Sequence, residues 1–463
     1  MAQKLYSTKS DRLLEMIRLK QDMTLRQQFS LTAQLSLPSM LAQLSMIVMF
    51  FIDVGMVGHL GAKQSAAIGL VETTTWLMGG LGSAVSMGFS VQVAHAIGGN
   101  DFEGARRILR QSIVCALIWS LAMMIVCIAI HRQLPFWLGG GPEIAHDASS
   151  YFLIVGCSSI FFQMEGLAGS MLKCAGNMKV PSMLNIAMCI MDVVFNYFFI
   201  YVLEMGVVGA AMGTGVAMLV TAALMLYFLT CRSGILALKG TRGSFRPQSL
   251  VVSKAFKIGA PMGLQHLLMG SANIVITLIV APLGVVAIAA NSIAITVESL
   301  CYMPGFGISE AATTLVGQCL GAGRRELTKS FASLAVKMGM LTMTAMAVLM
   351  WIFARELMQV MSPVEDIIAL GVDVLRIEAW AEPMFAAAIV CNGIFVGAGD
   401  TLRPAAMSLV SMWAVRLTLA ALLAPHYGLQ GVWMAMCVEL CFRGAIFLWR
   451  LATGAWLKAI DRL

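Results

Sequence analysis

Long apolar stretches follow one another along nearly the whole chain, and each is about the length of a membrane-spanning helix. A helix crosses a bilayer core of about 30 Å with roughly 20 apolar residues, and polar or Gly/Pro-rich breaks divide this chain into twelve such stretches. Charged residues make up only 12% of the sequence, whereas soluble proteins carry roughly 25%, and hydrophobic residues make up 59%. Because so few charges cannot cover a soluble surface of this size, the sequence predicts a polytopic membrane protein.

Each stretch is expected to be a helix, because a helix satisfies its own backbone hydrogen bonds in lipid. The predicted spans are 30–57, 64–92, 108–130, 148–173, 180–203, 206–231, 255–281, 285–316, 330–354, 367–397, 402–424 and 428–450. With the N-terminus inside, the inner segments hold 24 of the 31 basic residues, and the outer loops hold three. This asymmetry follows the positive-inside rule, so we expect both termini in the cytoplasm. It also accounts for most of the +7 net charge, so the charge does not call for a nucleic-acid partner.

The chain repeats itself at an offset of 223 residues, from Pro38 to Pro261. Ala175-Gly176-Asn177 corresponds to Ala398-Gly399-Asp400, and Gly206 corresponds to Gly428 one residue out of step. The matches fall at the same places in two six-span units, which indicates parallel repeats about an axis along the membrane normal. The predicted organisation is a basic cytoplasmic segment 1–28, a first lobe 29–231, a cytoplasmic linker 232–254, a second lobe 255–452 and a cytoplasmic tail 453–463.

Polar and acidic residues of the first half lie at similar predicted depth. Ionisable side chains inside spans are costly, so they are functional candidates. At about 1.5 Å per residue, Asp53, Asp192, Asn196 and Thr214 all fall in the outer half of the membrane. Asn185, Asp192 and Asn196 share one face of span 5, being seven and then four residues apart. We therefore expect the first four residues to lie close together.

This group supplies only hard oxygen ligands, which suit a small hard cation. Two neighbouring carboxylates also favour a proton held between them. Asp53, Asp192, Asn196 and Thr214 are therefore predicted to form a coupling site for a proton or for sodium, with Na⁺ as the candidate metal. The alternative is a polar network that only holds the helices together.

The second half does not copy this group. The repeat partners of the two aspartates are apolar, Ile276 and Val415. Its acids are expected to be dispersed: Glu298 lies in span 8, and Glu378 and Glu382 lie one turn apart in span 10. Glu298 and Glu382 are predicted near mid-membrane, where they would attract a cationic substrate.

Other polar residues are weaker candidates for a substrate cavity. Gln43 and His266 occupy equivalent repeat positions in spans 1 and 7, and Asn185 precedes the acidic residue of span 5. A hydrogen-bonded core position is the alternative for His266. Glu439 and Arg443 are spaced i, i+4, a pattern typical of a structural ion pair.

Several short motifs recur in order along the two halves. They are Ile52-Asp53, Val57-Gly58-His59-Leu60-Gly61, Ile97-Gly98-Gly99-Asn100, Leu320-Gly321-Ala322-Gly323, and the paired turns Gly-Asn-Met-Lys-Val-Pro and Gly-Asp-Thr-Leu-Arg-Pro after spans 4 and 10. In these motifs the chain resembles the multidrug and toxic compound extrusion (MATE) family, from about residue 31 to residue 451. The resemblance implies an all-α integral membrane protein with twelve transmembrane helices in two pseudo-symmetric six-helix bundles that form a V-shaped cavity.

The resemblance also implies a function, the export of organic and often cationic compounds against inward proton or sodium flow. Asp53 occupies the position of the family's coupling acid in span 1, and Thr214 keeps its span-6 threonine. The family's span 5 commonly has Asn followed four residues later by Asp, whereas here Asp192 precedes Asn196. This exchange leaves the preferred ion open. Around Met269 there is no span-7 acid, which argues against coupling through the second lobe.

Three other functions fit the sequence less well. A lipid-linked precursor flippase of the same superfamily would need more spans and several cavity cations for phosphates, whereas the spans, away from their inner ends, hold only Lys337, Arg376, Arg416 and Arg443. An enzyme would need a motif such as GxSxG or HExxH, and the sequence has neither. A passive channel would need a filter loop.

We expect no enzyme activity and no cofactor beyond the coupling ion. We also expect a monomer in the cell (inner) membrane that binds small organic substrates.

Overall fold

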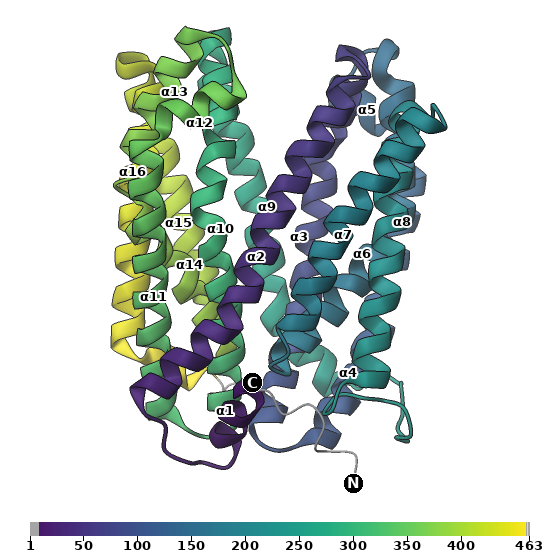
Figure 1. The fold of residues 1–463 in the computed structure, drawn as a ribbon, viewed down its shortest axis with the longest axis vertical. Coiled ribbons are helices and arrows are strands. Elements are labelled where there is room, and N and C mark those ends of the chain that lie inside the picture. The colour runs from purple at the N-terminus through teal and green to yellow at the C-terminus, as the bar shows by residue number, and fades with distance from the viewer. Residues whose placement is uncertain (1–8, 460, 462–463) are drawn as a thin grey trace. The chain divides into compact units, whose positions relative to one another are not determined.

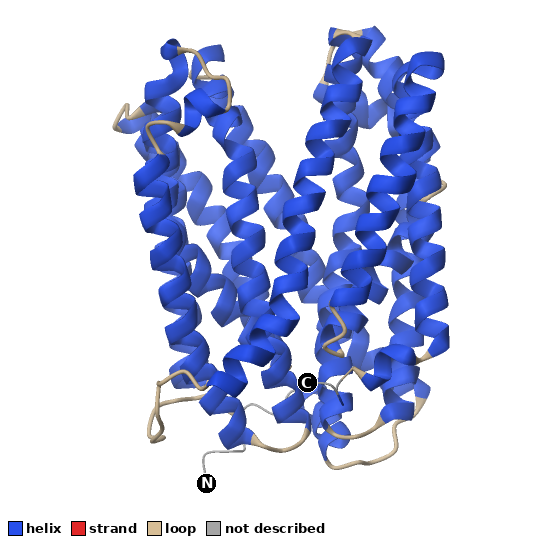
Figure 2. Ribbon diagram, turned by 180° about the vertical axis from the view of Figure 1, so that it is seen from behind, coloured by secondary structure: helices blue, strands red, loops and turns tan. Residues whose placement is uncertain are grey.

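The computed structural model describes residues 9–459 and 461, and every regular element among them is a helix (Figure 2). The all-α class expected from the sequence is confirmed. The helices, labelled in Figure 1, are α1 Lys9–Arg18, α2 Leu25–Gly58, α3 Ala62–Gly98, α4 Phe102–Ile130, α5 Leu134–Trp137, α6 Pro142–Cys174, α7 Lys179–Tyr197, η1 Phe198–Val202, α8 Gly206–Tyr227, η2 Phe228–Arg232, α9 Ser249–Val280, η3 Ala281–Leu283, α10 Val285–Gly321, α11 Arg325–Ile352, α12 Ala354–Met361, α13 Glu365–Glu378, α14 Glu382–Gly397, α15 Leu402–Val410, η4 Ser411–Arg416, α16 Leu417–Thr453 and η5 Ala455–Lys458.

The described helices account for twelve membrane crossings. Ten continuous helical stretches are long and apolar enough to span a bilayer, and α13 with α14 passes the same test as one span bent by 60°. The last of the ten, Leu402–Thr453, has 52 residues, more than twice the roughly 20 that one crossing needs. Its helix is broken at Gly428, where φ is 59° and ψ is −139°. Because this stretch supplies two crossings, the twelve spans agree with the prediction.

The sequence repeat is also present in the backbone. Gly176 and Gly399, in the equivalent turns after spans 4 and 10, have φ values of 92° and 80°. Gly206 and Gly428, which open spans 6 and 12, have φ values of 56° and 59°. Glycine is the residue that adopts positive φ at little cost. The two halves therefore share turn geometry as well as sequence.

The helices form two compact units. The first unit consists mainly of Ser45–Gly263, and the second of Leu13–Leu44 with Leu264–Leu463. Helices α2 and α9 each contribute one part to one unit and the remainder to the other. Both helices contain an internal proline, Pro38 and Pro261, shortly before the change of unit. A proline removes a backbone hydrogen bond and bends a helix, so each shared helix carries a bend-prone position near that change.

Each unit has its own apolar core. In the first unit, Leu109 of α4, Leu167 of α6 and Met225 of α8 are fully buried against one another. In the second, α10, α13 and α16 contribute core residues such as Leu375 and Trp433. Large hydrophobic side chains also cover the outer helix faces. Such a surface suits contact with lipid rather than water.

Contacts within each unit hold the connecting segments in place. The loop between η2 and α9 lies against α4, because Arg106 donates to the Ile235 carbonyl over 2.8 Å and Arg110 donates to Thr241 over 2.6 Å. In the second unit, Arg324 donates to the Gln21 carbonyl just after α1 over 2.6 Å.

Candidate functional site

A hydrogen-bonded cluster joins α2 to α7 in the first unit. The Asn196 side-chain nitrogen donates to Asp53 Oδ1 and to Asp192 Oδ2, each over 3.0 Å. The two carboxyl groups lie beside each other, and the Thr214 hydroxyl of α8 lies beside Asp192. The structure therefore brings together all four residues that the sequence predicts for the coupling site.

The cluster is rich in oxygen atoms and short of donors. Asp192 and Asn196 are only 1% and 2% exposed, while Asp53 is half-buried. Asp192 Oδ1 and Asn196 Oδ1 are buried and accept no hydrogen bond within the described part of the chain. A buried acceptor without a partner costs about 1–3 kcal/mol, so this arrangement favours a species that brings positive charge. A proton and a small hard cation both meet that need.

A close approach of α8 to α7 sets the geometry of this cluster. A Cβ atom at Gly213 would overlap the side-chain oxygen of Asn196 and lie 2.8 Å from its backbone nitrogen. Only glycine permits this approach without a shift. One residue past Asn196, α7 ends and the π-helical turn η1 begins at Phe198. Such turns often occur at functional sites in helices.

Asn185 lies on α7 about three turns before Asn196, and it does not join the cluster. With its amide nitrogen turned toward α6, it donates to Glu165 Oε1 over 3.0 Å and to the Pro181 carbonyl over 3.2 Å. Its partner is thus another acid of the first unit.

Gln43 and His266 occupy different environments despite their equivalent repeat positions. Gln43 donates to Glu310 Oε1 of α10 over 3.3 Å within the second unit. His266 is exposed on α9 and makes no hydrogen bond with any described residue, so the alternative of a hydrogen-bonded core histidine is wrong. Glu310 was not predicted as a functional residue, although it is an acid inside span 8.

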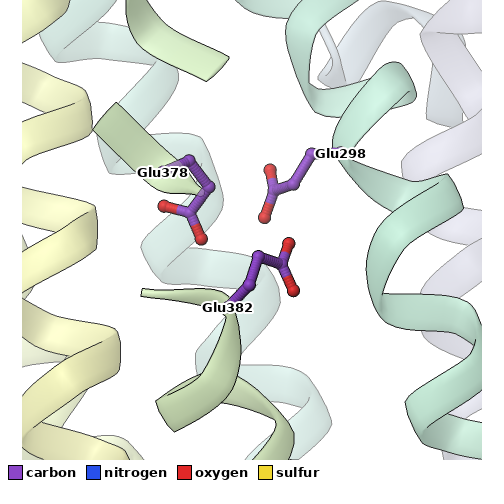
Figure 3. Close-up of side chains that lie close together, drawn as sticks. All are labelled: Glu298, Glu378 and Glu382. Carbon is purple, nitrogen blue, oxygen red and sulfur yellow. The ribbon is translucent and has the colours of Figure 1, made fainter. Parts of the chain in front are cut away.

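The second unit holds three buried glutamates whose carboxyl groups converge (Figure 3). One carboxylate oxygen from each of Glu298, Glu378 and Glu382 lies within 4.8 Å of the others. The expectation of dispersed acids in the second half is therefore wrong. Helix α13 ends at Glu378 and α14 begins at Glu382 after a 60° bend, and this bend turns both side chains toward Glu298 on α10 (Figure 3).

Glu439 and Arg443 of α16 form the structural ion pair that their spacing predicts. Arg443 Nε donates to Glu439 Oε1 over 2.8 Å, and Arg443 Nη2 lies 2.6 Å from the same oxygen. The Glu439 side chain is fully buried, and Ser411 of η4 also donates to it. The hydrogen bond from Ser411 joins η4 to α16.

The fold defines a class of protein, a polytopic helical membrane protein whose two halves repeat one six-span plan. The sequence pattern of the MatE family matches residues 38–198 and again residues 261–422. The chain therefore belongs to the MatE family. The two matches begin at Pro38 and Pro261, the repeat partners found in the sequence, and they confirm the internal duplication.

Similar proteins cover nearly the whole chain. The "Probable multidrug resistance protein NorM" of Thermotoga maritima is 25% identical over 412 residues, which are 88% of each chain. A solved structure described as MATE in complex with MaL6 has a TM-score of 0.89 at 20% identity, and the match covers 98% of this chain and 100% of that one. A MOP superfamily transporter from Pyrococcus furiosus has a TM-score of 0.88 at 20% identity with the same coverage. These structural likenesses establish a shared fold.

Proposed function

We propose that this protein is a secondary active antiporter that exports organic, often cationic, compounds in exchange for protons or sodium. Membership of the MatE family supports transport. The relative from Thermotoga maritima and a second from Pectobacterium atrosepticum, 24% identical over 419 residues, are both described as multidrug resistance proteins. The substrates of this chain would then be small organic molecules.

One observation carries the coupling half of this proposal, the shared amide of Asn196. It holds Asp53 and Asp192 together from a single nitrogen, while two buried oxygens of the cluster lack a donor. A proton or Na⁺ that enters this group neutralises repulsion between the carboxylates and satisfies these oxygens. Thr214 supplies a further oxygen. The cofactor of this antiporter is the coupling ion alone.

Antiport needs the ion and the substrate to favour different helix arrangements. The cluster joins α2 to α7, so a bound ion changes the force between these helices. An ion that binds all arrangements equally shifts no equilibrium. The ion must therefore stabilise the arrangement with α2 against α7, whereas the substrate stabilises another. Asn185, Gln43 and His266 remain predicted contributors to the substrate cavity, whereas the burial of Glu298 and Glu382 favours a separate role for these two acids.

We also propose a location and an orientation for this protein. A multi-span protein with basic residues on one side is expected in the cell (inner) membrane with both termini in the cytoplasm. We propose that it works as a monomer, because the predicted coupling site is complete within one chain.

Efflux from vesicles tests the function. The purified protein is reconstituted, a fluorescent organic cation is loaded, and proton and sodium gradients are imposed separately. The proposal predicts gradient-driven efflux with at least one of the two ions, and its loss in Asp53→Asn. The matched control Glu143→Gln removes an exposed acid of the same unit and should transport normally. Dye movement that ignores both gradients would refute antiport.

A further inference from the structure

The tenth span is interrupted in mid-course, and two glutamates flank the interruption. Glu378 is the last residue of α13 and Glu382 is the first residue of α14, with a 60° bend between the two helices. Pro383 at the second position of α14 prevents the upstream helix from continuing. Broken helices within membranes commonly form ion sites, because the break frees polar groups that a continuous helix would use internally.

The carboxylates at this break are buried without partners. Glu378 and Glu382 are 0% exposed, and all four of their carboxylate oxygens lack a hydrogen bond among the described residues. Glu298, 5% exposed, faces them from α10 (Figure 3). The surrounding core is apolar, with Val297 and Leu375 beside these acids in sequence. A buried carboxyl group is stable when it is protonated, paired with a cation or coordinated to a metal.

Among the described residues, one arginine acts on the charge of this cluster. Arg416 of η4 is the cation that interacts with Glu298 and Glu378, yet it forms no ion pair with either of them. One of its Nη atoms points to the sulfur of Met436 over 2.6 Å. The other nearby arginine, Arg443, is committed to Glu439. When all three carboxyl groups are ionised, one guanidinium leaves two negative charges to be balanced.

We propose that Glu298, Glu378 and Glu382 form a binding site for one divalent cation with oxygen ligands, of the size of Ca²⁺ or Mn²⁺. The charge of such an ion matches the two unbalanced negative charges. Ca²⁺ takes six to eight oxygens at about 2.3–2.6 Å, so ligand atoms within 4.8 Å of one another are spaced to share one ion. Three carboxylates that bind in bidentate fashion supply six oxygens.

The position of the site gives the ion a mechanical role. Its ligands come from both sides of the break in the tenth span and from α10, so the ion fixes the bend between α13 and α14. The repeat partners of the three glutamates are Thr75, Val155 and Ser159. The equivalent helix α6 runs unbroken from Pro142 to Cys174. The site therefore belongs to the second unit alone and is separate from the Asp53 cluster.

Mn²⁺ binding to the full-length detergent-solubilised protein tests this site. Electron paramagnetic resonance measures free Mn²⁺, and we expect about one bound ion per chain that Ca²⁺ displaces. Glu378→Gln and Glu382→Gln should each weaken binding at least about tenfold, since even outer-sphere partners of metal ligands contribute that much. Two control variants should leave Mn²⁺ binding unchanged. They are Asp53→Asn in the first unit and Glu356→Gln, which removes an exposed acid of the second unit.

A second measurement keeps the test decisive if one variant does not fold. Ca²⁺ should raise the thermal unfolding midpoint of the parent protein, and this rise should be absent in Glu298→Gln. Failure of the parent to bind Mn²⁺ at millimolar concentration would overturn the proposal, and the three acids would then hold protons instead. Binding that persists in both Glu378→Gln and Glu382→Gln, or that disappears only in Asp53→Asn, would overturn it as well.

Discussion

Asp53 of α2 and Asn196 of α7 stand 143 positions apart in the sequence and are joined by a 3.0 Å hydrogen bond. The same nitrogen of Asn196 holds Asp192, one turn earlier on α7. A change of charge on either carboxyl group therefore alters the bond that the other one shares. This arrangement makes the contact between α2 and α7 sensitive to a bound proton or cation.

The first prediction is that Asp53 and Asp192 act as one unit in ion binding. Asp53→Asn and Asp192→Asn should each abolish the release of a bound dye by the coupling ion, and the double variant should be no worse. Groups that share one partner give strongly non-additive effects. Equilibrium dye binding, titrated with sodium and with acid, provides the measurement. Independent, additive losses in the two single variants would show that the carboxyl groups are not linked.

The second prediction concerns the close approach of α8 to the cluster. Gly213→Ala places a Cβ atom on the side-chain oxygen of Asn196, so the helices must separate. We expect a loss of stability of about 1–3 kcal/mol, as for overpacking in a core, together with weaker gradient-driven efflux. Thermal unfolding and vesicle efflux measure the two effects. Gly166→Ala on α6 is the control, because a Cβ there meets no atom within 4 Å.

The third prediction concerns the buried ion pair of the second unit. Arg443→Met leaves Glu439 charged and buried, which should cost roughly 3–5 kcal/mol of stability. Adding Glu439→Gln removes the unpaired charge, so the double variant should regain most of that loss. The measurement is thermal unfolding, in one detergent, of the parent protein, Arg443→Met, Glu439→Gln and the double variant. If the double variant is as unstable as the sum of the singles, the pair is not the source of the effect.

The fourth prediction concerns the turn between spans 11 and 12. Gly428 has φ 59° and ψ −139°, a conformation that side-chain-bearing residues adopt at a cost of about 1–3 kcal/mol. Gly428→Ala should lower the unfolding midpoint accordingly. Gly270→Ala, in α9 with no atom within 4 Å of the added Cβ, should not lower it.

Much of this architecture was predictable from sequence because membrane spans follow from local composition. Apolar length gave the twelve crossings, and matched glycines and prolines gave the repeat. The proximity of Asp53 to Asp192 followed from depth, since a helix converts sequence position into height with a fixed rise per residue. The break between spans 11 and 12 also followed from the sequence, because span 12 was predicted to begin at Gly428, where the helix is broken.

The glutamate cluster was beyond that reasoning. Glu378 and Glu382 would lie on one face of an unbroken helix, and their spacing alone does not reveal a 60° bend between them. Convergence with Glu298 depends on how α10 packs against α13, which is a long-range property. The same holds for Glu310, whose partner Gln43 lies 267 positions away.

Dye binding in two single variants tests the division of roles between the units most directly. A fluorescent organic cation is bound at equilibrium to the purified protein and displaced by sodium and by acid, in the parent, in Asp53→Asn and in Glu382→Gln. We predict that Asp53→Asn still binds dye but that the ion no longer displaces it, whereas the ion still displaces dye from Glu382→Gln. Loss of ion displacement in Glu382→Gln, together with normal displacement in Asp53→Asn, would contradict the assignment of coupling to the first unit.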